Sequence, residues 1–412
     1  MLKKSIRKIL YFYIMLNPSN RGLNMPASPI RKLVPFAEEA KKKGIKVHHM
    51  NIGQPDIETP PSILQAVKDT KIKVLAYSHS AGNESYRKKL GRYYKKLGLD
   101  IAPDQIMITS GGSEGIVFGM MACLDPGDEL IVPEPFYANY NGFAVMAGIE
   151  IVPITSNIET GFALPPIADF EKVITPKTKG ILICNPNNPT GYLYSKEEMK
   201  SLEEICLKHQ LFLFSDEAYR EFCYEGIATS AMELSKIQDQ VIIFDTISKR
   251  YSACGARIGA FITKNKEVYN AAMKFAQARL SPPGLAQILA EAALDLPDNY
   301  FDIPKAAYQS RRDLLVKRLN QMEGVLCPNP GGAFYVIAKL PIDDGDRFCQ
   351  WLLESFDYKN ETVMLAPASG FYNTNGLGKN EVRLAYVINN EEIDRAMDCL
   401  EESLKVYPGK TT

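Results

Sequence analysis

The chain has 412 residues, which is enough for two or three domains with substantial cores. Its 48 basic and 48 acidic residues balance, and no basic block or stripe indicates a nucleic-acid surface. The eight cysteines form no CxxC pair, which favours reduced thiols in a cytoplasmic protein over a disulfide framework. The four histidines have no metal-ligand spacing to the cysteines, so we expect no metal site.

Residues 1–24 differ in character from the rest of the chain. Basic residues precede a short apolar stretch from Ile9 to Leu16, as in a signal peptide, but no small-x-small cleavage site follows. The stretch is also far too short to cross a membrane. We therefore expect a disordered or misassigned extension before Met25, and no association with a membrane.

The next elements are helices separated by a Gly/Pro turn. Apolar residues at helical spacing predict an amphipathic helix over 30–43, which Gly44 ends. Residues 49–56 are predicted to form a short strand that breaks into a turn, and Pro61 suits the first turn of a further helix. We expect residues 25–58 to form an N-terminal arm that contributes to a small domain.

Short apolar runs alternate with helical patterns in the middle of the chain. The runs are residues 106–108, 129–132, 149–152, 180–184, 211–214, 241–244 and 258–262. Helical patterns such as 114–124 and 196–209 lie between them. Short, continuously apolar strands with intervening helices indicate an α/β fold with a mostly parallel central sheet and helices on both faces. Ligands of such a sheet gather beyond the carboxyl ends of its strands.

The last third of the chain changes character. Its predicted elements are a helix at 305–322, a strand at 331–337, a helix at 347–356, strands at 362–365 and 382–387, and a helix from Glu391. This αβαββα-like pattern predicts a smaller α/β domain at 301–412 beside a large domain at 59–300. No internal repeat is visible.

Lys249 follows the apolar run 241–244, and Arg257 lies further along the chain between Gly255 and Gly259. An amine at a strand end can form a Schiff base with an aldehyde, and a nearby guanidinium can hold a phosphate. Pyridoxal 5'-phosphate offers both groups. Taken alone, the two residues are better explained as solvated cations at an ordinary strand end.

A glycine-rich segment, residues 109–115, follows the first apolar run and opens a helix. Glycines at a helix start let backbone N–H groups approach a phosphate, although glycine-rich turns are common. The segment lacks the G-x-G-x-x-G spacing of dinucleotide-binding proteins, which disfavours a nicotinamide-dependent oxidoreductase.

Two further strand ends carry polar groups. Residues 185–191 contain two Asn-Pro steps, which stiffen a loop and favour a cis bond. Asp216 ends the next apolar run and is suited to pair with a protonated ring nitrogen, or to cap a helix. Asn188, Asp216 and Lys249 thus stand at the ends of successive strands, which favours a shared site over unrelated turns.

The motifs N-P-x-N-P-T-G, D-E-x-Y, S-K-x7-R-x-G, G-G-x-F and a late V-R-L occur in this order. With them, residues 27–405 resemble the fold type I, pyridoxal-phosphate-dependent aminotransferases of class I/II, of which aspartate aminotransferase is typical. The resemblance implies pyridoxal 5'-phosphate as cofactor, held by the large domain, and a homodimer with shared active sites.

The resemblance also implies roles at the cofactor ring. Lys249 matches the lysine that forms the Schiff base and later moves a proton. Asp216 matches the aspartate that faces the pyridinium nitrogen and keeps the ring an electron sink. Tyr219 and Asn188 match groups bonded to the ring hydroxyl, with Tyr219 among the catalytic residues. Tyr137 matches the aromatic that stacks on the ring, although a core aromatic is the alternative.

At the phosphate, the resemblance implies backbone amides of Gly112 and Ser113 together with Thr246 and Arg257. A bidentate guanidinium adds geometry as well as charge. Tyr77 matches a tyrosine that reaches the phosphate of the neighbouring subunit.

At the substrate, Arg383 matches the arginine that binds the α-carboxylate, with Gly53 and Asn188 beside it. No residue clearly matches a second arginine that reads a dicarboxylate side chain. Arg279 lies in a suitable region, but support of the subunit interface is the favoured alternative for it. The family's proline-glycine turn is shifted here at residues 367–371.

We therefore expect an aminotransferase that moves an amino group from an L-amino acid, with aspartate first, to 2-oxoglutarate by a ping-pong mechanism. A β-eliminating C–S lyase would share all of these residues and stays open. A cofactor-free binding protein is a weaker alternative, because Lys249, Asp216 and Arg257 are all present.

Overall fold

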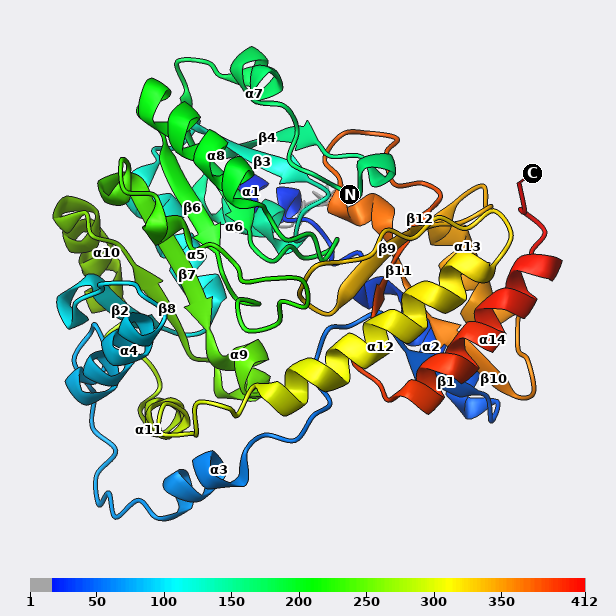
Figure 1. Ribbon diagram of the computed structural model, residues 1–412, viewed down its shortest axis with the longest axis horizontal. Coiled ribbons are helices and arrows are strands. Elements are labelled where there is room, and N and C mark those ends of the chain that lie inside the picture. The colour runs from blue at the N-terminus through cyan, green and yellow to red at the C-terminus, as the bar shows by residue number, and fades with distance from the viewer. Residues whose placement is uncertain (1–16, 412) are drawn as a thin grey trace, which may run out of the picture.

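The computed structural model describes residues 17–411 (Figure 1). Most of the predicted extension at 1–24, including the stretch from Ile9 to Leu16, therefore lies outside the described residues. The described part of this extension contains the short helix α1 (Asn20–Asn24). The Gly22 N–H donates to the Ser19 hydroxyl and so caps this helix. Within residues 17–411, no helix has the length and apolar character needed to cross a bilayer.

All seven predicted apolar runs contribute strands to one sheet, in the order β2-β8-β7-β6-β5-β3-β4. Neighbouring strands are parallel except around β8, which is antiparallel to both β2 and β7. The predicted mostly parallel sheet is therefore confirmed. Its strands are β2 (Ile106–Thr109), β3 (Glu129–Glu134), β4 (Glu150–Thr155), β5 (Thr178–Cys184), β6 (Phe212–Asp216), β7 (Val241–Thr246) and β8 (Gly259–Ile262).

Helices cover both faces of this sheet, as the side-chain alternation along a single strand shows. Ile181 and Ile183 of β5 belong to the core on one face, and Leu182 between them belongs to the core on the other. The first core contains α3 (Pro61–Lys68), α4 (Glu84–Lys96), α7 (Ile167–Val173), α8 (Lys196–His209) and α11 (Gly284–Ala293). The second contains α5 (Gly112–Cys123), α6 (Asn139–Ala147) and α10 (Lys266–Ala278).

A second lobe lies beside the large sheet, and the long helix α12 (Asp302–Gln321) runs toward it (Figure 1). Its three-stranded antiparallel sheet has the order β11-β12-β9. The lobe is built from β9 (Tyr335–Lys339), α13 (Gly345–Glu354), β10 (Glu361–Met364), β11 (Ala366–Pro367), β12 (Glu381–Ala385) and α14 (Asn390–Val406). The αβαββα-like pattern expected here is therefore present.

The N-terminal arm joins this second lobe. After a single 3-10 turn at Arg31–Leu33, α2 (Val34–Lys42) accounts for the predicted amphipathic helix. The strand β1 (Lys46–His49) begins three residues before the predicted one, because its register is set by parallel pairing with β10. Leu33, Ala37 and Val47 share a core with residues of α12, α13 and α14. We propose on this basis the division into arm (25–58), large domain (59–300) and small domain (301–412).

Candidate active site

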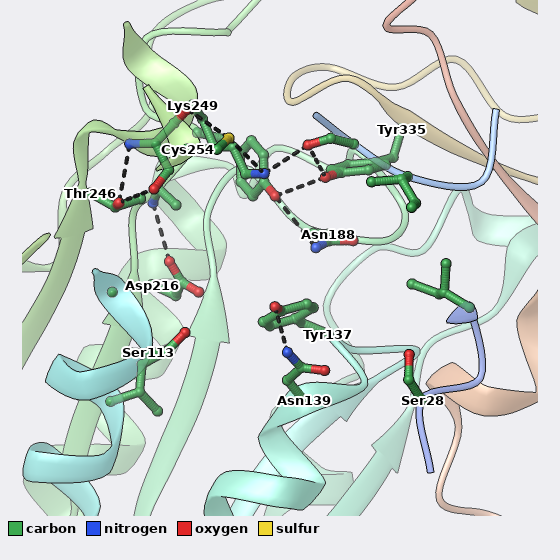
Figure 2. Close-up of a pocket in the computed structure, with 18 of the residues that line it drawn as sticks. Ser28, Ser113, Tyr137, Asn139, Asn188, Asp216, Thr246, Lys249, Cys254 and Tyr335 are labelled. Carbon is green, nitrogen blue, oxygen red and sulfur yellow. Dashed lines mark hydrogen bonds between the residues drawn. The ribbon is translucent and has the colours of Figure 1, made fainter. Parts of the chain in front are cut away.

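A cavity of about 280 Å³ lies where the carboxyl ends of β5, β6 and β7 face the arm and the second lobe (Figure 2). Parallel strands bring residues that are distant in sequence to one edge of the sheet, which explains why the predicted groups meet here. The predicted residues that line it are Gly53, Gly112, Ser113, Tyr137, Asn188, Asp216, Tyr219, Thr246, Lys249, Arg257 and Arg383.

Lys249 lies in α9 (Ile247–Arg250), a single turn that begins directly after β7. The Thr246 hydroxyl accepts a hydrogen bond from the Ser248 N–H at 3.1 Å and so caps this turn. The Lys249 Nζ donates to the Gly53 carbonyl at 2.7 Å and lies 4.0 Å from the Cys254 sulfur. Within residues 17–411 Lys249 forms no ion pair, so its amine faces the cavity without an acidic partner.

Asp216, the last residue of β6, is buried and lines the cavity. Its carboxylate accepts hydrogen bonds from the Tyr140 hydroxyl at 2.9 Å and from the Ala218 N–H at 3.2 Å. Burial raises the pKa of Asp216 to about 6, because the described part of the chain offers it no cation. A positively charged ligand atom would stabilise the ionised form. Sequence reasoning missed Tyr140, which lies three residues after Tyr137, at the start of α6.

Tyr219 and Asn188 both line the cavity and contact each other. The two hydroxyls of Tyr219 and Tyr335 are 3.0 Å apart, and the Asn188 amide donates to the Tyr219 oxygen at 3.4 Å. Burial raises the pKa of Tyr219 well above its usual value. The loop that carries Asn188 contains the cis bond Asn185–Pro186, as the sequence predicted. Tyr335 was not predicted, although it directly follows the G-G-x-F motif.

Arg383 lies in the middle of β12 and is 2% exposed. Its guanidinium donates to the Asn188 side-chain oxygen at 3.1 Å and to the Asn51 carbonyl. The ring centroids of Tyr335 and Phe371 lie 4.7 and 4.8 Å from it. Burial lowers the pKa of Arg383, and no carboxylate in the described chain is paired with it. A buried guanidinium in this state is suited to bind a carboxylate.

Glycines bring the Arg257 guanidinium against the start of α5. A side chain on Gly111, which has φ +79°, would place its Cβ 2.3 Å from an Arg257 nitrogen. A Cβ on Gly259 would lie 2.5 Å from the Gly111 carbonyl carbon. The first-turn N–H groups of α5, at Gly112 and Ser113, thereby share one wall with a guanidinium, which is an arrangement suited to a phosphate.

Tyr137 also lines the cavity (Figure 2). Its ring packs edge-on against Tyr140 at 5.5 Å, and its hydroxyl accepts a hydrogen bond from the Asn139 amide at 2.7 Å. Burial raises the pKa of Tyr137 to about 12. Ser28 and Arg31 of the arm also line the cavity, and no pattern in the sequence pointed to them.

Two of the residues singled out from the sequence do not reach this cavity. Tyr77 is 78% exposed in the segment between α3 and α4. Arg279 pairs with Glu114 at 3.2 Å and donates to the Ile108 carbonyl at 3.1 Å. Arg279 therefore lies on the α5 side of the sheet, and within one chain it does not read a ligand in the cavity.

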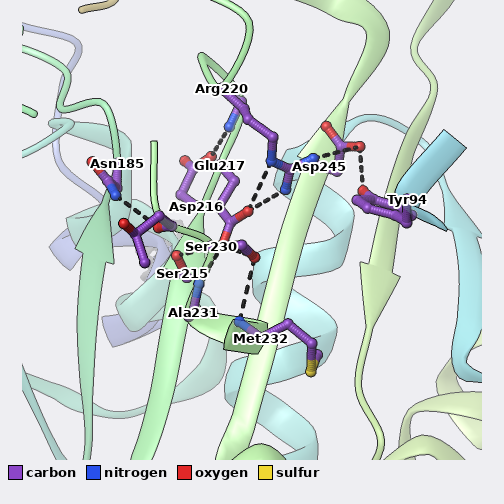
Figure 3. Close-up of polar contacts among 12 residues, drawn as sticks. Tyr94, Asn185, Ser215, Asp216, Glu217, Arg220, Ser230, Ala231, Met232 and Asp245 are labelled. Carbon is purple, nitrogen blue, oxygen red and sulfur yellow. Dashed lines mark hydrogen bonds and ion pairs between the residues drawn. The ribbon is translucent and has the colours of Figure 1, made fainter. Parts of the chain in front are cut away.

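A buried network of ion pairs lies directly beside the site (Figure 3). Glu217 accepts hydrogen bonds from Arg220, from the Ser230 hydroxyl at 3.0 Å and from the Ala231 N–H at 3.0 Å. Asp245 is paired with Arg250 and accepts from the Tyr94 hydroxyl. The network ties the ends of β6 and β7 together and so fixes the two strands that carry Asp216 and Lys249.

Comparisons with known proteins agree on one family. The sequence profile described as aminotransferase class I and II matches residues 45–400. An aspartate aminotransferase of Thermotoga maritima is 32% identical over 392 residues, covering 94% of this chain and 99% of that protein. Aromatic-amino-acid aminotransferase 2 of Thermococcus litoralis is 30% identical, covering 95% and 97%. A solved structure described as an alanine aminotransferase from Pyrococcus furiosus has a TM-score of 0.86 and 33% identity, covering 94% and 100%.

Proposed function

The chain belongs to the class I and II aminotransferases, which depend on pyridoxal 5'-phosphate, and on that premise we propose its substrates and the roles of its residues. It transfers the amino group of an L-amino acid, with aspartate first, to 2-oxoglutarate by a ping-pong mechanism. One observation carries the proposal: within residues 17–411, a single cavity is lined by a buried carboxylate that has no cationic partner and by cations that have no acidic partner. These residues include Asp216, Lys249, Arg257 and Arg383.

The residues of the cavity fit the cofactor. Burial raises the pKa of Asp216 to about 6, and a protonated ring nitrogen beside it would lower that pKa and stabilise the carboxylate. Arg257 and the N–H groups of Gly112 and Ser113 form a cradle that a Cβ at position 111 would fill. When bound, the cofactor supplies an electron sink for the negative charge that develops at the substrate Cα. Tyr137 is proposed to cover the ring.

Lys249 is proposed to hold the cofactor and to carry the proton that leaves the substrate Cα. Its amine is held 2.7 Å from the Gly53 carbonyl, which gives it a defined position when it is not covalently engaged. Arg383 is proposed to bind the substrate α-carboxylate and orient the Cα proton toward that amine. Asn188, which contacts both Arg383 and Tyr219, is proposed to keep the carboxylate and the ring hydroxyl in register.

Transamination is tested by mixing the loaded enzyme with single amino acids and recording the change in the cofactor's absorption. With aspartate and 2-oxoglutarate together, glutamate should accumulate, and double-reciprocal plots at several acceptor concentrations should be parallel. Release of pyruvate and ammonia from cystathionine, without glutamate formation, would instead establish the C–S lyase. Replacing Arg383 with alanine should weaken every amino-acid substrate to a similar extent.

We also propose a homodimer. Tyr77 lies on an exposed apolar surface that includes Val74 (77% exposed), Leu75 (59%) and Leu280 (51%). Apolar patches of this kind mark protein contacts. A second copy of the chain that covers this surface would bring Tyr77 to its phosphate cradle. Light scattering should give the mass of a dimer, and Tyr77→Phe should weaken cofactor retention while leaving that mass unchanged.

The eight cysteines are free thiols, as the sequence predicted. Free thiols persist in reducing compartments, and on this ground we propose the cytoplasm as the site of action. Fractionation of the source cells, followed by an activity assay, tests the assignment.

A further inference from the structure

Arg31 is a cation on the cavity wall that the cofactor and a substrate α-carboxylate leave without a partner. It lies in the 3-10 turn Arg31–Leu33 of the N-terminal arm and lines the same cavity as Lys249, Arg257 and Arg383. Its side chain is exposed, and no ion pair or hydrogen bond of its guanidinium exists within residues 17–411. It therefore differs from Lys32 beside it, which pairs with Asp346.

The backbone of Arg31 is held firmly although its side chain is exposed. The Arg31 N–H donates to the Ser28 hydroxyl at 3.3 Å, and Leu33 is 2% exposed in the core of the second lobe. Ile30 packs against the small cluster that contains Phe371, whose ring contacts Arg383. The arm thus places Arg31 at the substrate side of the cavity and not at the phosphate cradle beside α5.

The charges that line the cavity can be matched to ligand groups. The lining residues include four cations, among them Arg31, and one carboxylate, Asp216. The proposed function assigns Arg257 to the phosphate, Lys249 to the cofactor aldehyde, Asp216 to the ring nitrogen and Arg383 to the α-carboxylate. A neutral amino acid leaves Arg31 without an anion, whereas a dicarboxylic substrate supplies one.

We propose that Arg31 binds the side-chain carboxylate of dicarboxylic substrates, namely aspartate, glutamate and 2-oxoglutarate. The inference rests on the proposed function and names the residue that sets its substrate class. A guanidinium offers two parallel donors to a carboxylate, which makes the contact directional as well as strong. Arg279 does not compete for this role within one chain, because its guanidinium is engaged by Glu114 and by the Ile108 carbonyl.

Three variants test the proposal: Arg31→Gln, Arg31→Lys and, as matched control, Lys32→Gln. In Arg31→Gln, kcat/KM for aspartate and 2-oxoglutarate should fall by roughly 10- to 100-fold, the usual worth of a charged hydrogen bond. The values for alanine and pyruvate should change by less than about threefold. Arg31→Lys should restore part of the loss, and Lys32→Gln should resemble the wild type.

A binding measurement without turnover accompanies the kinetics. Calorimetric titration of the loaded enzyme with succinate, a dicarboxylate that cannot react, should show a dissociation constant raised by a similar factor in Arg31→Gln alone. Equal losses for alanine and aspartate, or an unchanged succinate constant, would overturn the role of Arg31. If the wild-type enzyme transaminates only neutral amino acids, the role of Arg31 is also overturned, whereas transamination still stands as the function. If the enzyme eliminates and does not transaminate, the proposed function fails, and succinate binding still decides the role of Arg31.

Discussion

Two pairs of neighbouring residues show how this chain separates structural from reactive charge. Asp216 and Glu217 are adjacent, as are Lys249 and Arg250, and all four come from the ends of β6 and β7. Glu217 and Arg250 turn into the network of Figure 3 and its surroundings, where each has an oppositely charged partner. Asp216 and Lys249 face the cavity of Figure 2, where the described chain gives neither of them such a partner.

The two pairs show where the free-energy cost of burying a charge is offset. Burying an ion without a partner costs roughly several kcal/mol in desolvation free energy, so such an ion persists only where other interactions offset that cost. In the network, burial alone would raise the pKa of Asp245, but Arg250 and Arg220 outweigh it and hold that pKa below its usual value. In the cavity, the pKa of Asp216 stays raised until a ligand supplies the positive charge.

The largest effect is expected when the reactive member of a pair is removed. Lys249→Ala should reduce turnover by roughly four orders of magnitude or more, because the amine that binds the cofactor and moves the proton is absent. Borohydride should no longer fix the cofactor to the chain. The melting temperature of the cofactor-free protein should hardly change, since Lys249 forms no ion pair within residues 17–411. Substantial residual turnover would refute the role of Lys249.

The structural neighbour should behave in the opposite way. Arg250→Ala leaves Asp245 buried without its main partner, and breaking such a pair costs about 3–5 kcal/mol. Urea denaturation of the cofactor-free protein should show this loss. Arg257→Ala is the control, because its guanidinium donates only to the Cys254 carbonyl in the described chain. If both variants lost equal stability, the contrast between network and cavity would be wrong.

Asp216 should show the contrast within one residue. In the folded protein its pKa is about 6, above the ordinary 3.8. The contribution of its protonated form to the free energy of unfolding is therefore complete below pH 3.8 and is lost as the pH rises through 6. In the cofactor-free protein at pH 8, Asp216→Asn should therefore stabilise the fold by up to about 3 kcal/mol, at roughly 1.36 kcal/mol for each pKa unit. The gain should vanish near pH 4. With cofactor added, the same variant should lose most of its activity and bind the cofactor more weakly.

The smallest effect concerns a hydroxyl that serves the site indirectly. Tyr335→Phe removes the contact to the Tyr219 hydroxyl at 3.0 Å but keeps the ring against Arg383. We expect kcat/KM to fall about fivefold, the worth of one neutral hydrogen bond, and the pH midpoint of the cofactor's absorption to shift. Tyr386→Phe loses a comparable hydrogen bond to the Ala333 carbonyl outside the cavity, and should leave that midpoint unchanged.

Local patterns were sufficient to predict the large sheet. Most of its strands are short apolar runs, such as 180–184, that are buried on both faces, so their positions depend on their own residues and the adjoining turns. The strand β1 was placed three residues late, because its limits depend on β10, far away in the sequence. The antiparallel orientation of β8 was not foreseen either, since an apolar run has no direction.

The residues of the site also divide into those that local patterns predicted and those that depend on distant segments. Asn188, Asp216 and Lys249 were found because each terminates a predicted strand, and parallel strands end at one edge. Tyr335 and Arg31, which line the cavity, and Tyr140, which contacts Asp216, were missed because packing between segments brings them to the site. The role of Tyr77 depends on a second chain, which no pattern within one sequence can place.

The pairing of β1 with β10 has a consequence for synthesis on the ribosome. His48 of β1 contacts Glu361, which is translated 313 residues later. The nascent arm, with its apolar Leu33, Ala37 and Val47, must therefore wait without its partners while the large sheet is completed. The substrate side of the pocket, which includes Gly53 and Arg31, can thus be completed only after the second lobe has been synthesised. Chaperones have their longest opportunity to bind at this arm.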